Sequence, residues 1–307
     1  MISSIINIIR PIHWIKNLFL FAAIIFSGNL FNEILFSKVL WAFVGFSLAS
    51  SASYTFNDVM DAKYDRLHPI KKFRAVASGK ISSPVAILIS FLFTLFSLVL
   101  AKTLNPLFFW AVIAYLVLQF FYSLGLKKIA IIDILIIATG FIIRVYAGAF
   151  VIDAHLSVWF LLCVISVSLF LAAGKRRAEL NLLPQEGITR ESLAHYQREL
   201  LNSYVTMFGN AAWMSWSLFT FFESPRASLP VWLFLAELSR TTTINKLLMF
   251  TIPVTIFGIM RYESLIFEGR SESPEKLLLT DIYLMSSVFL WLVMIIWIFY
   301  GGLATIG

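Results

Sequence analysis

Long apolar runs constrain this chain more than any other feature. A helix needs about 17–25 predominantly apolar residues to cross the roughly 30 Å hydrocarbon core of a membrane, and nine stretches of the sequence meet that length. The predicted spans are residues 17–34, 38–56, 84–101, 106–123, 130–151, 156–174, 201–221, 244–261 and 281–301. Because the backbone finds no water inside a bilayer, each span is expected to be helical. We therefore predict an all-α integral membrane protein with nine transmembrane helices.

The composition supports one membrane domain over residues 1–307. Hydrophobic residues make up 60% of the chain and charged residues 13%, against about 25% charged in soluble domains. The apolar runs leave little sequence for a second domain outside the membrane. The single cysteine, Cys163, excludes an intrachain disulfide and lies in an apolar run, where inert packing is expected.

Basic residues gather on one side of the predicted spans. The N-terminus and the loops after spans two, four, six and eight hold most of the 24 Lys and Arg residues. The positive-inside rule then places these segments in the cytoplasm, and we expect a multi-pass protein of the cell (inner) membrane. This bias and a phosphate site explain the net charge of +7 better than nucleic-acid binding, for which no motif is present. Residues 2–16, which lack a small-residue cleavage site, are predicted to form an amphipathic interfacial helix.

A polar segment after the second span carries the clearest chemical signal. Asn57 precedes three carboxylates, Asp58, Asp61 and Asp65, whose spacings of three and four residues place them on one helix face. Like charges on one face repel each other unless a cation lies between them, and oxygen ligands favour a hard cation, Mg²⁺ before Ca²⁺. Basic side chains interleave with and follow the acids over residues 63–80. The pattern indicates a site for a metal-chelated diphosphate; the alternative is a solvated loop that ends a helix.

Further polar clusters lie near the cytoplasmic ends of other spans. Asp133 and Arg144 are about three helical turns apart on one face, and ionisable residues in a span usually face a cavity. The alternative is a structural partner on another helix. Lys175 and Arg176 follow span six, where a positive-inside anchor is the alternative. The less specific candidates are Lys16, Asn17, Tyr122 and Lys127.

The acidic segment resembles the first aspartate-rich motif of the UbiA superfamily of membrane prenyltransferases, and the nine-span layout is similar too. Most members carry a second aspartate-rich motif after span six, where this chain has Gly-Lys-Arg-Arg-Ala-Glu-Leu at residues 174–180. Residues 10–17, 57–74, 122–127 and 173–180 are similar to the decaprenyl-phosphate phosphoribosyltransferase branch, although Ala75 stands where the branch has proline. The resemblance covers essentially the whole chain, and we expect the helices to enclose a cavity open to the cytoplasmic side.

The resemblance implies transfer of 5-phosphoribose from 5-phosphoribosyl 1-diphosphate (PRPP) to a decaprenyl-like polyprenyl phosphate, with release of diphosphate and a requirement for Mg²⁺. Asp58, Asp61 and Asp65 are the expected catalytic residues and, with Asn57, the expected metal ligands. The expected substrate-binding residues are Lys16, Asn17, Asn57, Lys71, Lys72, Arg74, Tyr122, Lys127, Asp133, Arg144, Lys175 and Arg176. The lipid phosphate is mostly ionised near neutral pH, so no general base is expected.

Two other functions stay open on the sequence. One is a UbiA-type prenyltransferase that takes a prenyl diphosphate and an aromatic acceptor, although the missing second acidic motif disfavours it. The other is a non-catalytic lipid transporter, which the intramembrane Asp133 and Arg144 would suit. A transporter would not need the acidic cluster. The sequence leaves the oligomeric state and the length of the lipid chain open.

Overall fold

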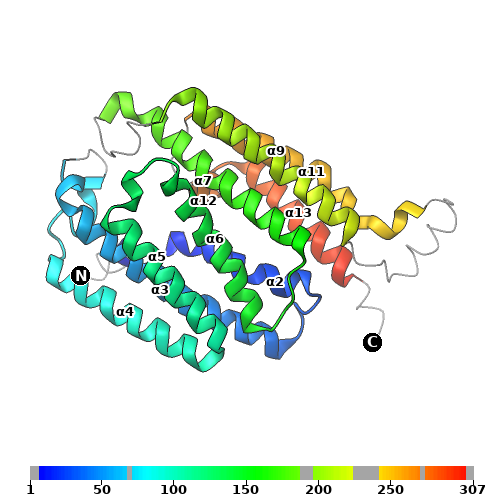
Figure 1. The fold of residues 1–307 in the computed structure, drawn as a ribbon, viewed down its shortest axis with the longest axis horizontal. Coiled ribbons are helices and arrows are strands. Elements are labelled where there is room, and N and C mark those ends of the chain that lie inside the picture. The colour runs from blue at the N-terminus through cyan, green and yellow to red at the C-terminus, as the bar shows by residue number, and fades with distance from the viewer. Residues whose placement is uncertain (1–6, 68–70, 187–195, 224–241, 270–273, 302–307) are drawn as a thin grey trace. The chain divides into compact units, whose positions relative to one another are not determined.

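The structure is a computed structural model that describes residues 7–67, 71–186, 196–223, 242–269 and 274–301. Throughout these ranges all regular secondary structure is helical, which confirms the all-α prediction (Figure 1). The chain divides into two compact units, which are described separately. The first comprises Met1–His155 with Glu179–Arg198, and the second Leu156–Ala178 with Glu199–Gly307. The single domain expected over residues 1–307 stays a prediction.

The first unit is built around one long helix. Its helices are η1 (Pro11–Leu20), α2 (Phe21–Phe26), α3 (Glu33–Asp65), η2 (Lys71–Phe73), α4 (Ser83–Leu104), α5 (Pro106–Leu124), η3 (Leu126–Lys128) and α6 (Ile132–Val151). The helices of the second unit are α7 (Val158–Glu186), whose last turns belong to the first unit, α9 (Arg198–Phe222), η4 (Thr242–Thr251), α11 (Ile252–Phe267), α12 (Pro274–Thr280) and α13 (Ile282–Tyr300).

Seven helices among the described residues are long and apolar enough to cross a membrane, so the predicted count of nine is not confirmed. They are α3, α4, α5, α6, Val158–Leu180, Leu247–Phe267 and α13. The predicted span 17–34 is wrong at its end, because helix α2 stops at Phe26 and the chain turns at Gly28 with a φ of 76°. The predicted span 201–221 falls on α9, whose apolar residues alternate with Asn202, Asn210 and several hydroxyl side chains.

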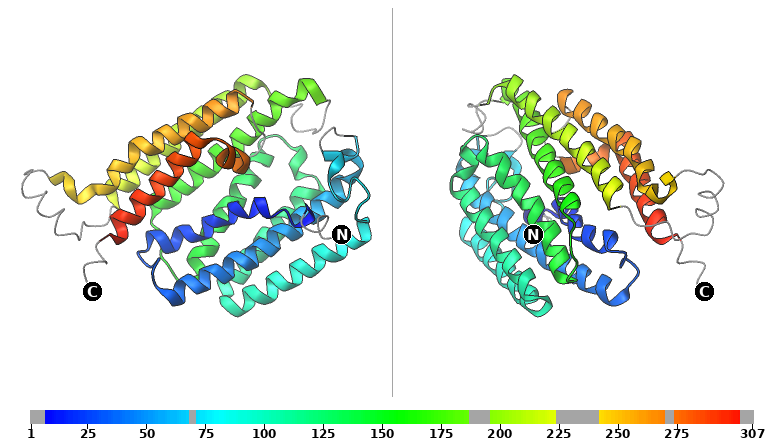
Figure 2. Two further views of the ribbon diagram at one scale, coloured as in Figure 1. Left: turned by 180° about the vertical axis from the view of Figure 1, so that it is seen from behind. Right: turned by 45° about the vertical axis from the view of Figure 1, so that its right-hand side comes forward.

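Helix α3 packs closely along α4, as both views in Figure 2 agree. Its middle carries a run of small residues, Ala49–Ser53, which allows a neighbouring backbone to approach. Two serines of α4 use this proximity: Ser97 Oγ donates to the carbonyl of Gly45 (2.7 Å), and Ser90 Oγ donates to that of Ala52 (2.8 Å). The opposite face of α4 exposes large apolar side chains such as Phe91 and Phe96, as expected of a surface that faces lipid.

An amphipathic interfacial helix was predicted for residues 2–16, of which residues 2–6 lie outside the described part of the chain. Residues 7–16 do not form one continuous helix. The segment is helical at residues 7–9, breaks at Arg10 with a φ of 54°, and continues from Pro11 as η1. Ile8 is fully buried in a small core with Ala62, Val76 and Ala86, because this segment lies against α3 rather than on the surface. Helix η1 is also pressed against α6, where a Cβ on Gly148 would overlap the carbonyl oxygen of Leu20.

Candidate functional site

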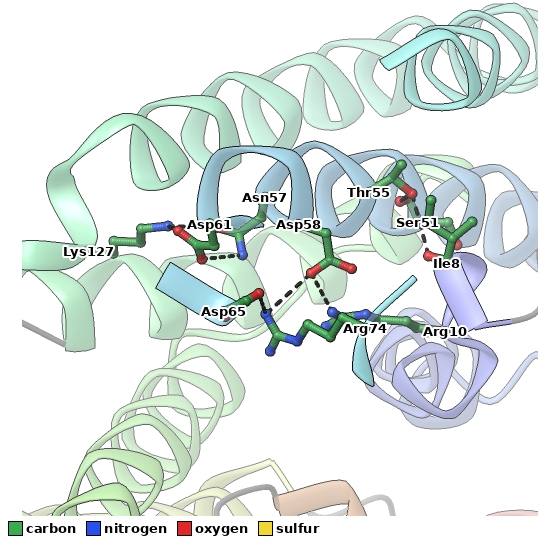
Figure 3. A network of polar contacts seen from close by, with 10 residues as sticks. All are labelled: Ile8, Arg10, Ser51, Thr55, Asn57, Asp58, Asp61, Asp65, Arg74 and Lys127. Carbon is green, nitrogen blue, oxygen red and sulfur yellow. Dashed lines mark hydrogen bonds and ion pairs between the residues drawn. The ribbon is translucent and has the colours of Figure 1, made fainter. Parts of the chain in front are cut away.

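The candidate site lies at the C-terminal end of α3. The predicted span ended at residue 56, but α3 continues without interruption to Asp65, so the acidic segment is helical. Asp58 and Asp65 are 2% and 6% exposed, whereas an isolated carboxylate avoids burial. Each acid therefore needs partners of opposite charge. Figure 3 shows that protein cations supply them in two groups.

The first group joins Asn57, Asp61 and Lys127. The Lys127 ammonium donates to the Asn57 side-chain oxygen (3.0 Å) and to Asp61 Oδ1, while Asn57 Nδ2 donates to Asp61 Oδ2 (2.9 Å). Lys127 lies in η3, within the short connection from α5 to α6, and is only 7% exposed. The structure thus brings together residues that are 66 and 70 positions apart in the chain.

The second group joins Asp58 and Asp65 to two arginines. Arg74 Nη1 donates to Asp65 Oδ2 (2.7 Å) and to Asp58 Oδ1 (3.3 Å). Arg10 Nη2 donates to the same Asp58 oxygen (2.5 Å). Arg74 is fixed by the turn after η2, because its N–H donates to the carbonyl of Lys71 and its carbonyl accepts from the N–H of Ser78, both at 2.9 Å.

Sequence reasoning missed Arg10 as a site residue. It occurs in the opening segment that carries the family resemblance, but only the structure aims it at Asp58. Two hydroxyl groups of α3 hold the residues before it: Ser51 donates to the carbonyl of Ile9 (2.9 Å) and Thr55 to that of Ile8 (3.4 Å). The left-handed backbone at Arg10 then directs its side chain back over α3.

The two groups together are electrically neutral, since three carboxylates face three cations. Carboxylate and amide oxygens are the ligands that Mg²⁺ prefers, so the donor set at the end of α3 fits that ion. Within the described ranges, however, no three acidic, histidine or cysteine side chains converge as a metal site. The magnesium assignment to Asn57, Asp58, Asp61 and Asp65 stays a prediction.

A separate buried network surrounds Arg144. Its Nε donates to Asn17 Oδ1 (2.8 Å), its Nη2 to the Tyr115 hydroxyl (3.1 Å), and its Nη1 to the Gly140 carbonyl. The guanidinium lies 4.8 Å from the centroid of the Tyr115 ring and 5.3 Å from that of Phe46, a cation–π arrangement. Two residues predicted to bind substrate, Asn17 and Arg144, therefore bind each other, which fixes η1 against α6.

Asp133, which was predicted to lie on the same helix face as Arg144 about three turns away, has a partner of its own. It is fully buried in the first turn of α6 and accepts a hydrogen bond from the Tyr196 hydroxyl (2.7 Å). The same hydroxyl accepts from the backbone N–H of Ile131 (2.5 Å). Tyr196 lies in the polar stretch before α9, and no motif in the sequence drew attention to it.

The remaining predicted residues lie on η1, η2, α5 and α7. Lys71 and Lys72 form η2 beside the Arg74 turn, and Lys16 lies 6.0 Å from the Tyr54 ring centroid. Tyr122 is half-buried in the last turn of α5. Lys175 and Arg176 belong to α7 in the second unit, where Arg176 is fully buried. Their roles as substrate ligands stay predictions.

Comparison with known proteins gives a consistent result. Residues 17–175 match the family model described as the UbiA prenyltransferase family. The decaprenyl-phosphate phosphoribosyltransferase of Mycolicibacterium smegmatis is 35% identical over 95% of this chain and 91% of its own. The protein of the same name from Corynebacterium glutamicum is 31% identical over 96% of this chain and 86% of its own.

Solved structures share the fold. A UbiA homolog from Archaeoglobus fulgidus bound to DMAPP and Mg²⁺ superposes with a TM-score of 0.66 at 16% identity, covering 96% of this chain and 98% of that one. A structure of the same homolog bound to GPP and Mg²⁺ gives a TM-score of 0.65 at 17% identity, with the same coverage of both chains.

Proposed function

Because the chain belongs to the UbiA prenyltransferase family, we propose that it transfers 5-phosphoribose from PRPP to a polyprenyl phosphate and releases diphosphate. The names of its relatives supply the reaction class. The observation that carries the proposal is the interleaving of Asp58, Asp61 and Asp65 with Arg10, Arg74 and Lys127 at one helix end. Acids suit a metal and strong bases suit phosphate, and a metal-chelated diphosphate needs both.

The reaction replaces one bond at C1 of the ribose by another. The bond from C1 to the diphosphate oxygen breaks, the electron pair leaves with diphosphate, and an oxygen of the lipid phosphate bonds to C1. That oxygen is already ionised near neutral pH, so no side chain needs to remove a proton. Asn57, Asp58, Asp61 and Asp65 would hold Mg²⁺, which when bound stabilises the charge of the leaving diphosphate.

The three cations of the site have a second task in this proposal. Before substrate binds, they neutralise the carboxylates, so the cluster carries no net negative charge. With the carboxylates engaged in holding a chelated diphosphate, Arg10, Arg74 and Lys127 would turn their N–H donors to phosphate oxygens. The guanidinium of Arg74 already reaches two acceptors through one nitrogen, so its other nitrogens are suited to a bidentate phosphate contact.

The other predicted ligands complete the proposal. Lys71 and Lys72 are assigned to the 5-phosphate of PRPP or to its diphosphate. Lys175 and Arg176, which belong to the second unit, are retained as predicted phosphate ligands. Lys16 and Tyr122 are retained as substrate contacts. We further propose that the protein lies in the inner membrane and that its site faces the cytoplasm, the aqueous compartment from which PRPP would bind. This orientation follows from the positive-inside pattern of the sequence.

The test is direct product analysis. Purified protein in lipid nanodiscs is incubated with PRPP, Mg²⁺ and decaprenyl phosphate, and the lipid extract is analysed by mass spectrometry. The expected product is decaprenyl phosphate that has gained one phosphoribosyl group, and chelation with EDTA should remove it. A parallel reaction contains farnesyl diphosphate and an aromatic acid. Prenylation of the acid, with no use of PRPP, would replace our proposal by ordinary prenyl transfer.

A further inference from the structure

Tyr196 fastens the segment that carries Lys127. We name residues 125–131, between α5 and α6, the Lys127 loop. We propose that Tyr196 is a positioning residue, which holds this loop so that Lys127 stays at the acidic end of α3. The inference rests on the proposed function, because it takes Lys127 as a residue that binds phosphate.

The hydroxyl of Tyr196 makes two hydrogen bonds at the junction of the Lys127 loop and α6. It accepts the N–H of Ile131 at the end of the loop (2.5 Å) and donates to Asp133 Oδ1 in the first turn of α6 (2.7 Å). Both the tyrosine and the aspartate are buried. A hydrogen bond to a buried charged group is stronger than a neutral one, so this hydroxyl is a firm attachment point.

The backbone at the attachment point is strained. Ile131 has a φ of 70° and a ψ of −48°, a region that β-branched residues rarely adopt. Such a conformation persists only where the surroundings hold it, and it tends to occur at functional sites. The Tyr196 hydroxyl is the group that the Ile131 N–H meets, so removing it should let the loop relax.

The loop is short enough for that relaxation to reach Lys127. Helix α5 ends at Leu124 and α6 begins at Ile132, and a single 3₁₀ turn fills the loop between them. Its other backbone hydrogen bonds among the described residues are local and join it to the adjoining helix ends. Within the loop, Lys128 N–H donates to the Gly125 carbonyl (2.9 Å) and Ile129 N–H to the Leu126 carbonyl (3.2 Å). At the helix ends, Gly125 N–H donates to the Phe121 carbonyl (3.2 Å), and the carbonyls of Ile129 and Ile131 accept from Asp133 (3.1 Å) and Leu135 (3.0 Å). Lys127 lies in the middle, and its ammonium meets Asn57 and Asp61 (Figure 3).

This geometry gives Asp133 a different role from the substrate ligand expected on the sequence. Its carboxylate orients Tyr196, and the effect on substrate passes through Lys127. The two roles separate on substitution. Asp133→Asn keeps an oxygen that can accept from Tyr196, so it should lose less PRPP affinity than Asp133→Leu. An equal loss in both variants would assign Asp133 to direct charge contact and overturn the positioning role.

The first experiment measures the loop itself by hydrogen–deuterium exchange in nanodiscs without substrate. In Tyr196→Phe the amides of residues 125–135 should exchange about tenfold faster, which corresponds to one lost hydrogen bond. The matched control is Tyr204→Phe, a tyrosine of α9 whose ring packs against Phe208. It should leave those amides unchanged. Unchanged exchange in Tyr196→Phe would overturn the inference.

The second experiment asks whether Tyr196 acts through Lys127. PRPP affinity is measured for the wild type, Tyr196→Phe, Lys127→Gln and the double variant. In a protein that keeps Lys127, Tyr196→Phe should weaken PRPP binding about tenfold. In the Lys127→Gln background the same substitution should weaken PRPP binding little further. An equal loss in both backgrounds would mean that Tyr196 acts by another route and would overturn the inference. A wild type that ignores PRPP, while Tyr196→Phe still loosens residues 125–135, would refute the proposed function and support the attachment of the loop.

Discussion

Single residues decide the chemistry at the end of α3. The spacing of Asp58, Asp61 and Asp65 was enough to predict that they share a helix face, since helical periodicity is local. The pairing of Lys127 with Asp61 was not predictable, because it depends on where two distant segments meet. The same holds for Arg10, whose left-handed backbone is a conformation that sequence patterns assign to glycine or asparagine rather than arginine.

At this scale we expect Asp61→Asn to abolish turnover while the protein stays folded. The amide preserves the shape of the side chain but removes the charge that Lys127 and a metal would meet, and the loss should be at least about 100-fold. Product formation by mass spectrometry and thermal unfolding measure the two effects. Glu33→Gln, at the exposed first turn of the same helix, is the control and should behave as the wild type. Wild-type rates in Asp61→Asn would remove the metal assignment.

Neighbouring lysines offer a second comparison. Lys127 is buried against Asn57 and Asp61, whereas Lys128 is exposed. A charge-assisted contact contributes about 1.5–3 kcal/mol, so Lys127→Ala should weaken PRPP binding by roughly one to two decades. Lys128→Ala should change it little. Isothermal titration calorimetry measures PRPP affinity in both variants. A larger loss in Lys128→Ala than in Lys127→Ala would mean that Lys128, and not Lys127, faces the substrate.

At the scale of elements, close helix contacts fix the frame of the first unit. The run of small residues in α3 and the glycine of α6 at 148 indicate close packing, but the sequence does not reveal which neighbour fills each gap. In the structure, α4 packs against the small residues of α3, and η1 packs against Gly148 of α6. Helix α3 continues past residue 56, where span two was predicted to end, because polarity marks where a helix leaves the membrane and not where the helix itself ends.

Gly148→Ala should therefore be destabilising, although alanine favours helix over glycine by about 1 kcal/mol. The new methyl group would overlap the backbone of Leu20, which cannot move as a side chain can. We expect a loss of about 1–3 kcal/mol in the free energy of unfolding, typical of overpacking. Gly45→Ala is the matched control, since its methyl would meet only the flexible Leu100 side chain. Equal thermal stability of both variants would contradict the close contact.

The neutral charge at the end of α3 leads to a prediction about metal affinity. Without an anion the site should bind Mn²⁺ weakly, and inorganic diphosphate should raise the protein-bound fraction in electron paramagnetic resonance titrations. Arg74→Gln removes the cation shared by Asp58 and Asp65, so it should strengthen binding of Mn²⁺ alone and weaken that of diphosphate. A decrease in Mn²⁺ affinity in this variant would show that Arg74 supports the metal site instead of competing with it.

For the whole molecule, hydropathy was sufficient for the fold class, whereas the predicted count of nine spans is not confirmed within the described residues. Apolar runs and exposed apolar faces agree on a multi-pass membrane protein. The first predicted span failed because Pro11–Phe26 is a shorter apolar element that ends before the turn at Gly28. A hydropathy average over a window of residues does not detect this turn, because the turn depends on the backbone conformation of a single glycine.

The predicted orientation can be tested across α4. Lys80 precedes this helix and Lys102 lies in its last turn, and both side chains are exposed. The sole native thiol, Cys163, is buried, so background labelling should be low. On intact cells a membrane-impermeant maleimide should label Lys102→Cys and not Lys80→Cys. Labelling of Lys80→Cys alone would invert the orientation and place the acidic end of α3 outside.

The 33 residues of α3 imply where the two proposed substrates meet. An α-helix of that length measures about 50 Å, and even at the usual tilt of about 20° it exceeds the roughly 30 Å hydrocarbon layer. We therefore expect its acidic end to lie at the level of the lipid head groups. There a water-soluble sugar donor can reach the site without entering the hydrocarbon core, and the chain of a polyprenyl phosphate can stay within that core. The length of the helix thus places the reaction at the boundary between water and lipid.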